Sequence, residues 1–98
     1  MVKHIVMFRL NGTPEERRKI AGEFKKALMA LPAKIDVLRS MEVGLNDNPS
    51  EQWDVVLTAV VDTMDDVDIY AKHPDHVAAA SIVGPHKAGR ACVDYYFD

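Results

Sequence analysis

The sequence predicts a single α+β domain in which strands and helices follow the order strand, helix, strand, strand, helix, strand. Four segments are rich in apolar and β-branched residues with strand-like alternation, whereas the segments between them space apolar residues three or four positions apart. Residues typical of turns and helix ends separate these segments. The chain has 98 residues, which is room for one hydrophobic core, so residues 1–98 are expected to form one domain.

Composition and charge exclude several classes of protein. The apolar share of 48% and the charged share of 28% are normal for a globular domain. A net charge of −3 and the lack of a long basic run argue against a nucleic-acid partner, and no apolar run approaches the roughly 20 residues of a membrane span. Cys92 is the single cysteine and the N-terminus has no signal-peptide pattern, so a reducing cytoplasm is the expected compartment.

The first strand and the first helix are expected before residue 32. Residues Val2–Leu10 alternate imperfectly, and both of their faces are substantially apolar. Thr13 is the predicted N-cap of the helix, with Pro14 in its first position, and Thr13 and Glu16 match a capping box. Apolar residues then recur at helical spacing until Pro32 ends the helix.

Two further strands are expected in the middle of the chain. Residues 35–45 read as one long strand, and residues 46–49 supply the loop after it. Residues 53–61 form the most strand-like segment, in which Val55 and Leu57 share one face. Because the opposite face of this segment is also apolar, the strand is expected to be covered on both sides.

The last third of the chain contains a second helical region and a closing strand. Thr63 begins a helix that runs to about Lys72, Pro74 interrupts it, and helical turns resume over residues 75–83. Residues 90–97 are β-branched and aromatic and form the last strand. The resulting βαββαβ order is that of ferredoxin-like folds.

One face of the predicted sheet has no helix to cover it. In a ferredoxin-like fold both helices pack on the same face, and here the other face is apolar on at least the first and third strands. A second copy packed sheet against sheet covers that face as an isologous dimer. We therefore expect a homodimer through the sheet face, and we expect an Asp at Val55 or Leu57 to disrupt it, because a buried charge without a partner is costly.

Histidines and a tyrosine supply the most suggestive chemistry. His4 lies on the first strand, and Tyr70, His73 and His76 lie close together around Pro74. If the fold brings them near His4, then His76 and Tyr70 could line a pocket between helices and sheet. In such a pocket an imidazole transfers protons and the phenol holds an oxyanion. Alternatively, His73 caps a helix, His76 is hydrogen-bonded in the core and Tyr70 fills space. Both interpretations stay open at this point.

Other chemical motifs are weak or absent. No cysteine or carboxylate stands at standard zinc spacing from the histidines, so no metal site is expected. Cys92 is expected to be a buried, inert thiol, Trp53 a core or edge aromatic residue, and His86 part of a solvated loop. The chain has no phosphate-binding glycine loop, Cys-x-x-Cys pair or serine nucleophile motif, which argues against nucleotide hydrolysis and serine chemistry. No cofactor is expected.

Five segments stand out together, and they are Val2–Phe8, Met41–Gly44, Trp53–Asp54, Tyr70–His76 and Val93–Tyr95. They resemble the stress-responsive dimeric A/B barrel (Dabb) family over essentially the whole chain. The most specific part is the Tyr-x-x-His-Pro-x-His segment together with the early Lys-His-Ile. The resemblance implies a ferredoxin-like protomer, a homodimer whose sheets form a dimeric α/β barrel, and a cavity between sheet and helices.

The resemblance also implies a site. Plant polyketide cyclases of this family catalyse an intramolecular aldol condensation with a histidine and a tyrosine, and by position these roles fall on His76 and Tyr70, with His4 in support. It implies a protein that binds a small apolar ligand there or, alternatively, a cofactor-free lyase or isomerase working by proton transfer. A haem-degrading or antibiotic-biosynthesis type of monooxygenase ranks third, because the first strand lacks the asparagine of haem-degrading members.

Overall fold

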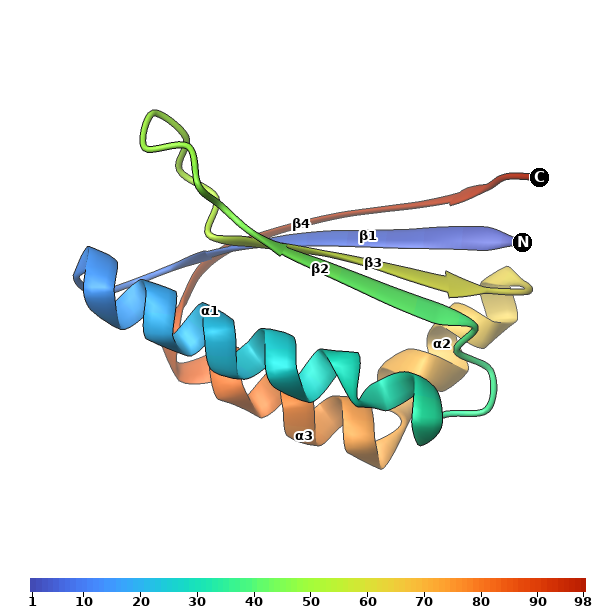
Figure 1. The fold of residues 1–98 in the computed structure, drawn as a ribbon. Coiled ribbons are helices and arrows are strands. Elements are labelled where there is room, and N and C mark those ends of the chain that lie inside the picture. Colours follow the sequence, from blue (N-terminus) through green and yellow to red (C-terminus); the bar gives the residue numbers. More distant parts are fainter.

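The computed structural model describes all 98 residues, and its elements follow the expected order (Figure 1). Helices and strands occupy β1 (Val2–Leu10), α1 (Pro14–Met29), β2 (Ser40–Leu45), β3 (Val55–Val61), α2 (Met64–Lys72), α3 (Pro74–Val83) and β4 (Lys87–Tyr96). Short 3₁₀ helices lie at Leu31–Ala33 and Gly84–His86. The predicted ferredoxin-like α+β fold is confirmed.

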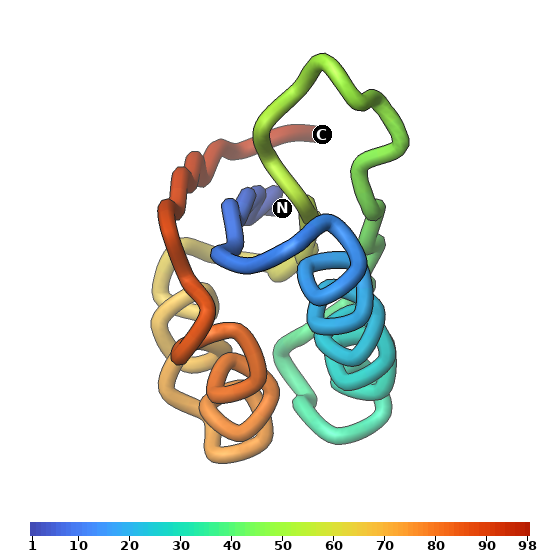
Figure 2. The backbone as a smooth tube through the Cα atoms, turned by 90° about the vertical axis from the view of Figure 1, so that its left-hand side faces the viewer, coloured from blue at the N-terminus to red at the C-terminus, as the bar shows by residue number.

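The four strands form one antiparallel sheet in the order β2-β3-β1-β4. The three helices lie on one side of this sheet, and the loop between β2 and β3 rises on the other side (Figures 1 and 2). β1 is therefore a central strand with β4 beside it, and His4 stands directly opposite Asp94. No helix combines the length and the apolar character needed to cross a membrane.

The start of α1 follows from its local sequence. The hydroxyl oxygen of Thr13 accepts a hydrogen bond from the Glu16 backbone N–H at 3.1 Å, and the same hydroxyl donates to the Glu16 carboxylate at 3.0 Å. Pro14 occupies the first helical position, where its missing N–H costs nothing. The predicted N-terminus of this helix is confirmed.

The second strand is shorter than predicted. It begins at Ser40, whereas residues 35–39 form turns in which the N–H of Ile35 bonds to the carbonyl of Leu31 and the N–H of Leu38 bonds to that of Ile35. Ile35 and Leu38 are buried in the core although they are not in the sheet. A buried turn and a buried strand present similar apolar patterns, and this explains the error.

The hydrophobic core lies between the sheet and the helices. The rings of Phe8 on β1 and Phe24 on α1 meet edge to face with centroids 5.5 Å apart. Val55 and Leu57 are only 2% and 3% exposed and belong to this core. The prediction that they lie on the dimer face is therefore wrong.

The sheet is also apolar on the side without helices, which we call the outer sheet face. Because side chains alternate along a strand, the outward residues of β3 are Val56, Thr58 and Val60, and all three are half-buried. On β4, Val93 and Tyr95 point outward and are 53% and 41% exposed. This outer sheet face is continuous across the pairing of β3, β1 and β4.

Candidate functional site

Three residues singled out from the sequence lie together on the helix side of the sheet. His4 comes from β1, Tyr70 from α2 and His76 from α3. The rings of His4 and Tyr70 are 5.8 Å apart in a T-shaped arrangement, and those of Tyr70 and His76 are 4.5 Å apart and tilted by 54°. Tyr70 thus stands between two imidazoles, and we call these three residues the histidine–tyrosine cluster.

The break between α2 and α3 positions two members of this cluster. α2 ends at Lys72 and Pro74 opens α3 in a new direction. His73 is the N-cap of α3, and its Nδ1 accepts a hydrogen bond from the backbone N–H of Asp75 at 3.1 Å. The structure therefore gives His73 a capping role, and one turn later His76 reaches the Tyr70 ring.

Tyr70 is fully buried, and its hydroxyl is the only buried side-chain polar atom without a hydrogen-bond partner. Burial raises the pKa of Tyr70 well above its usual value of 10.0, so the group is a neutral donor. Leaving such a hydroxyl unpaired costs about 1–3 kcal/mol, and most buried polar groups in native proteins find a partner. An unpaired buried donor in a native fold calls for a specific explanation, and a functional role is one such explanation.

The contacts of His76 determine which of its nitrogens carries the proton. Its Nδ1 lies 2.8 Å from the carbonyl oxygen of Ala71, and because a carbonyl can only accept, Nδ1 donates this bond. Burial lowers the pKa of His76 below 6.5, although the bond to Ala71 opposes that shift. At neutral pH the ring is therefore uncharged, and its Nε2 offers a lone pair to an acidic proton.

Two residues next to His4 were not singled out as partners from the sequence. The Nδ1 atom of His4 lies 2.5 Å from Oδ1 of Asp94 and 3.7 Å from Sγ of Cys92. Both partners stand on β4, 88 and 90 positions away in the chain. Only the antiparallel register of β1 with β4 brings them together, and the sequence carries no direct signal of that register.

Cys92 differs from its expected role as a buried thiol, because it is exposed on the edge strand. Partial burial of its sulfur raises the pKa of the Cys92 thiol, the carboxylate of Asp94 adds to this shift, and Arg90 opposes it. The free thiol is therefore mostly protonated at neutral pH. Trp53 matches the expected edge aromatic residue, since it is half-buried with the Arg9 guanidinium 5.9 Å from its ring centre.

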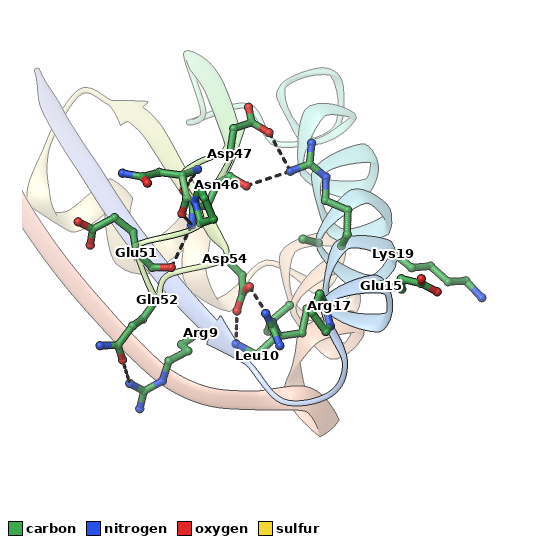
Figure 3. A pocket seen from close by; sticks show the side chains of 15 residues that line it. Arg9, Leu10, Glu15, Arg17, Lys19, Asn46, Asp47, Glu51, Gln52 and Asp54 are labelled. Carbon is green, nitrogen blue, oxygen red and sulfur yellow. Dashed lines mark hydrogen bonds and ion pairs between the residues drawn. The ribbon is translucent and has the colours of Figure 1, made fainter.

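A large hollow of the protomer lies elsewhere, between α1 and the loop that follows β2 (Figure 3). It measures about 1050 Å³, and two ion pairs join charged side chains that line it. Asp54 accepts bonds from the Leu10 backbone N–H at 2.7 Å and from Arg17 at 3.1 Å, while Arg18 pairs with Asp47 (Figure 3). We assign these contacts to holding the loop against β1 and α1.

A second hollow, of about 310 Å³, lies on the outer sheet face below the same loop. It is mostly apolar, and Met7, Trp53 and Val56 line it. Neither of these two hollows is lined by the histidine–tyrosine cluster. The cavity that the sequence resemblance implies between sheet and helices is therefore not one of these two.

Two known proteins are similar to this chain over most of its length. A protein of Streptomyces coelicolor, described as uncharacterized, is 34% identical over 86 residues, which are 84% of this chain and 86% of its own. A solved dimeric protein of unknown function and ferredoxin-like fold from Bacteroides fragilis is 52% identical, with a TM-score of 0.94 over 98% of this chain and 95% of its own.

A second solved protein, described as a dimeric ferredoxin-like protein of unknown function from Thermobifida fusca, is 31% identical. Its TM-score is 0.81 over 98% of this chain and 90% of its own. The sequence profile of the Stress Responsive A/B Barrel Domain (Dabb) matches residues 2–97, which is nearly the whole chain. This protein therefore belongs to the family of stress-responsive A/B barrel (Dabb) domains.

Proposed function

We propose that this protein binds a small, largely apolar molecule with a carbonyl group at the histidine–tyrosine cluster. One observation carries the proposal, and it is the fully buried hydroxyl of Tyr70 without a hydrogen-bond partner. A carbonyl oxygen placed against it would satisfy a donor that the folded chain leaves unpaired. Apart from the two imidazoles, the surroundings of Tyr70 belong to the hydrophobic core, so the rest of the ligand is apolar.

The edge strand β4 offers the route to this site. Cys92 and Asp94 lie on the inward face of β4, where Asp94 contacts His4. Both residues are exposed. We propose that a ligand reaches Tyr70 from this edge of the sheet, beside the buried ring of His4 and the half-buried ring of His76. Ligand entry then requires small side-chain movements at the sheet edge, while the central strands stay in place.

Binding is tested with acetophenone as the probe, an apolar aromatic ketone, by following backbone and ring NMR shifts during a titration. We expect shifts at Tyr70 and His76, and we expect Tyr70→Phe to weaken binding about fivefold or more, as the loss of one buried hydrogen bond implies. Tyr95→Phe removes a hydroxyl on the outer face of β4, on the opposite side of the sheet from the cluster, and is the matched control for ketone binding. Equal affinity in Tyr70→Phe would refute the assigned donor.

Proton transfer on the bound ketone is a second candidate function, and the contacts of His76 favour it. Neutral His76 with a free Nε2 can remove a proton from the carbon next to the carbonyl. The electron pair of the broken C–H bond moves onto the carbonyl oxygen, and the hydroxyl of Tyr70 donates a hydrogen bond to the enolate formed. Return of a proton from His76 to carbon restores the ketone.

Deuterium incorporation separates this second function from binding alone. In D₂O, phenylacetone incubated with the protein should gain deuterium at the carbons next to its carbonyl faster than in buffer. His76→Ala should abolish that excess, whereas His86→Ala, which removes a histidine outside the cluster, should retain it. Incorporation at the buffer rate, with acetophenone still bound, would leave a binding protein without this activity.

We also propose that two copies of the chain pack through the outer sheet face. The apolar side chains of β1, β3 and β4 on this face support the assignment, and so does the apolar hollow beside Trp53. The solved relatives at 52% and 31% identity are described as dimeric. Such an arrangement leaves the helix side, with the histidine–tyrosine cluster, away from the interface.

A further inference from the structure

Three side chains of different chemistry meet at the edge of the sheet. His4 projects from β1, and Cys92 and Asp94 project from β4 on the same face. Asp94 is the direct cross-strand partner of His4, and Cys92 lies two positions earlier on β4. One donor atom from each residue lies within 4.8 Å of the other two.

The distances among these atoms are close to those of ligands around one tetrahedral metal ion. Standard zinc bond lengths place a thiolate sulfur and an imidazole nitrogen about 3.5 Å apart, and a nitrogen and an oxygen about 3.3 Å apart. Here Sγ of Cys92 lies 3.7 Å from Nδ1 of His4 and 3.8 Å from Oδ1 of Asp94. Only the separation of 2.5 Å between His4 and Asp94 is too short.

A small movement of Asp94 corrects this separation. Its carboxylate has to withdraw from Nδ1 of His4 by about 1 Å to reach a ligand distance. The Asp94 side chain is 31% exposed and stands on an edge strand, so it is free to rotate, whereas the His4 side chain is only 8% exposed and is held in place. Because Cys92 is exposed, an ion can also reach the three donors from solvent.

We infer that His4, Cys92 and Asp94 form a site for a single zinc-class divalent ion, bound by Nδ1, Sγ and a carboxylate oxygen, with one coordination position open. A nitrogen, a sulfur and an oxygen donor suit Zn²⁺ or Co²⁺, whereas Mg²⁺ and Ca²⁺ prefer oxygen ligands alone. On binding, the thiol proton of Cys92 and the Nδ1 proton of His4 leave to solvent. The site shares His4 with the histidine–tyrosine cluster but does not use the hydroxyl of Tyr70, so the donor assigned to the proposed ligand is tested separately from the metal.

Cobalt(II) is the probe, because a thiolate bound to Co²⁺ produces a charge-transfer absorption in the near ultraviolet. Cys92 is the only cysteine of the chain, so such a band can come from no other residue. We expect the band to rise to saturation at one Co²⁺ per chain. This saturation point should be the same at every protein concentration. Zinc added in excess should remove it by replacing the cobalt.

Three variants identify the ligands. Cys92→Ser should abolish the band, and both Asp94→Ala and His4→Gln should weaken Co²⁺ binding by about tenfold or more, the least that loss of a direct ligand should cost. His86→Ala is the matched control for a histidine outside the group and should bind Co²⁺ as the wild type does. Circular dichroism checks that each variant is folded.

Two outcomes would overturn the inference. The first is the lack of a charge-transfer band with Co²⁺ in excess over the protein. The second is a band whose strength is unchanged in Asp94→Ala and in folded His4→Gln, since that would indicate a thiol binding cobalt without its neighbours. Neither result bears on acetophenone binding at Tyr70, which is measured without metal.

Discussion

At the scale of single residues, the most informative group is the hydroxyl of Tyr70. It is wholly buried beside two histidine rings, and the protomer supplies no acceptor for it. The chain therefore tolerates a cost to stability at this position, as proteins commonly do where a side chain is needed for function. The hydrogen bond from Nδ1 of His76 to the Ala71 carbonyl is also informative, because it leaves Nε2 free to accept a proton.

Removal of the Tyr70 hydroxyl should stabilise the protein. In Tyr70→Phe the unpaired donor is gone and the ring still fills its space, so we expect the free energy of unfolding to rise by about 1 kcal/mol. Urea denaturation measures this change, with Tyr95→Phe as the control for a tyrosine hydroxyl outside the core. A loss of stability in Tyr70→Phe would mean that the hydroxyl has a partner in solution.

The pKa of His76 should link stability to pH. Its value in the folded state is below 6.5, so the folded chain binds fewer protons than the unfolded chain as the pH falls through this range. The free energy of unfolding is therefore expected to be highest above pH 6.5 and to decline as the pH falls toward and through the folded pKa. An NMR titration of the His76 ring tests this directly, and a pKa at or above 6.5 would contradict it.

At the scale of elements, the junction of α2 with α3 places the site. Pro74 allows the chain to turn between the two helices, and His73 serves as the cap of the second one. The backbone N–H of Val77 bonds to the carbonyl of His73 at 3.0 Å, so the first turn of α3 is closed on this residue. The orientation of His76 toward Tyr70 depends on where α3 begins.

The cap at His73 should contribute measurably to stability. His73→Ala removes the acceptor for the Asp75 backbone N–H, and we expect the free energy of unfolding to fall by about 1 kcal/mol. His73→Asn keeps a capping acceptor and should retain most of the stability. If chemical denaturation finds both variants equal to the wild type, the capping bond is not significant in solution.

At the scale of the whole molecule, the two faces of the sheet have different roles. The helix side holds the core and the histidine–tyrosine cluster, and the outer sheet face is apolar without any helix over it (Figure 1). Val55 and Val56 are neighbours in the chain but point to opposite faces. The same substitution at these two positions should therefore have different consequences.

An Asp at Val56 should separate the proposed dimer. In that interface the new carboxylate would be buried without a partner, so we expect monomers in sedimentation analysis while the protomer remains folded. Ile69→Asp places the same charge on an exposed position of α2 and should leave the dimer intact. Val55→Asp should instead unfold the protomer, because this position is in the core. A dimeric Val56→Asp protein would rule out this face as the interface.

Local patterns in the sequence determined the type and order of the elements. Thr13, Pro14 and Pro74 act on the backbone within a turn of their own positions, so helix starts could be predicted without knowledge of the fold. Residues 35–39 were misassigned because burial outside a strand produces the same apolar pattern as burial within one. The residue types, and then the resemblance to the family, suggested His4, Tyr70 and His76 as one candidate site, and in the structure these residues are neighbours.

Tertiary structure decided which side of each strand faces the helices and which residues meet across the sheet. Val55 was assigned to the wrong face because both faces of β3 are apolar, and alternation alone does not distinguish them. Cys92 and Asp94 were not recognised as neighbours of His4, since that contact depends on the register of β1 with β4. Strand register is set by packing of the complete sheet, a nonlocal interaction between residues about 90 positions apart, and no local pattern encodes it.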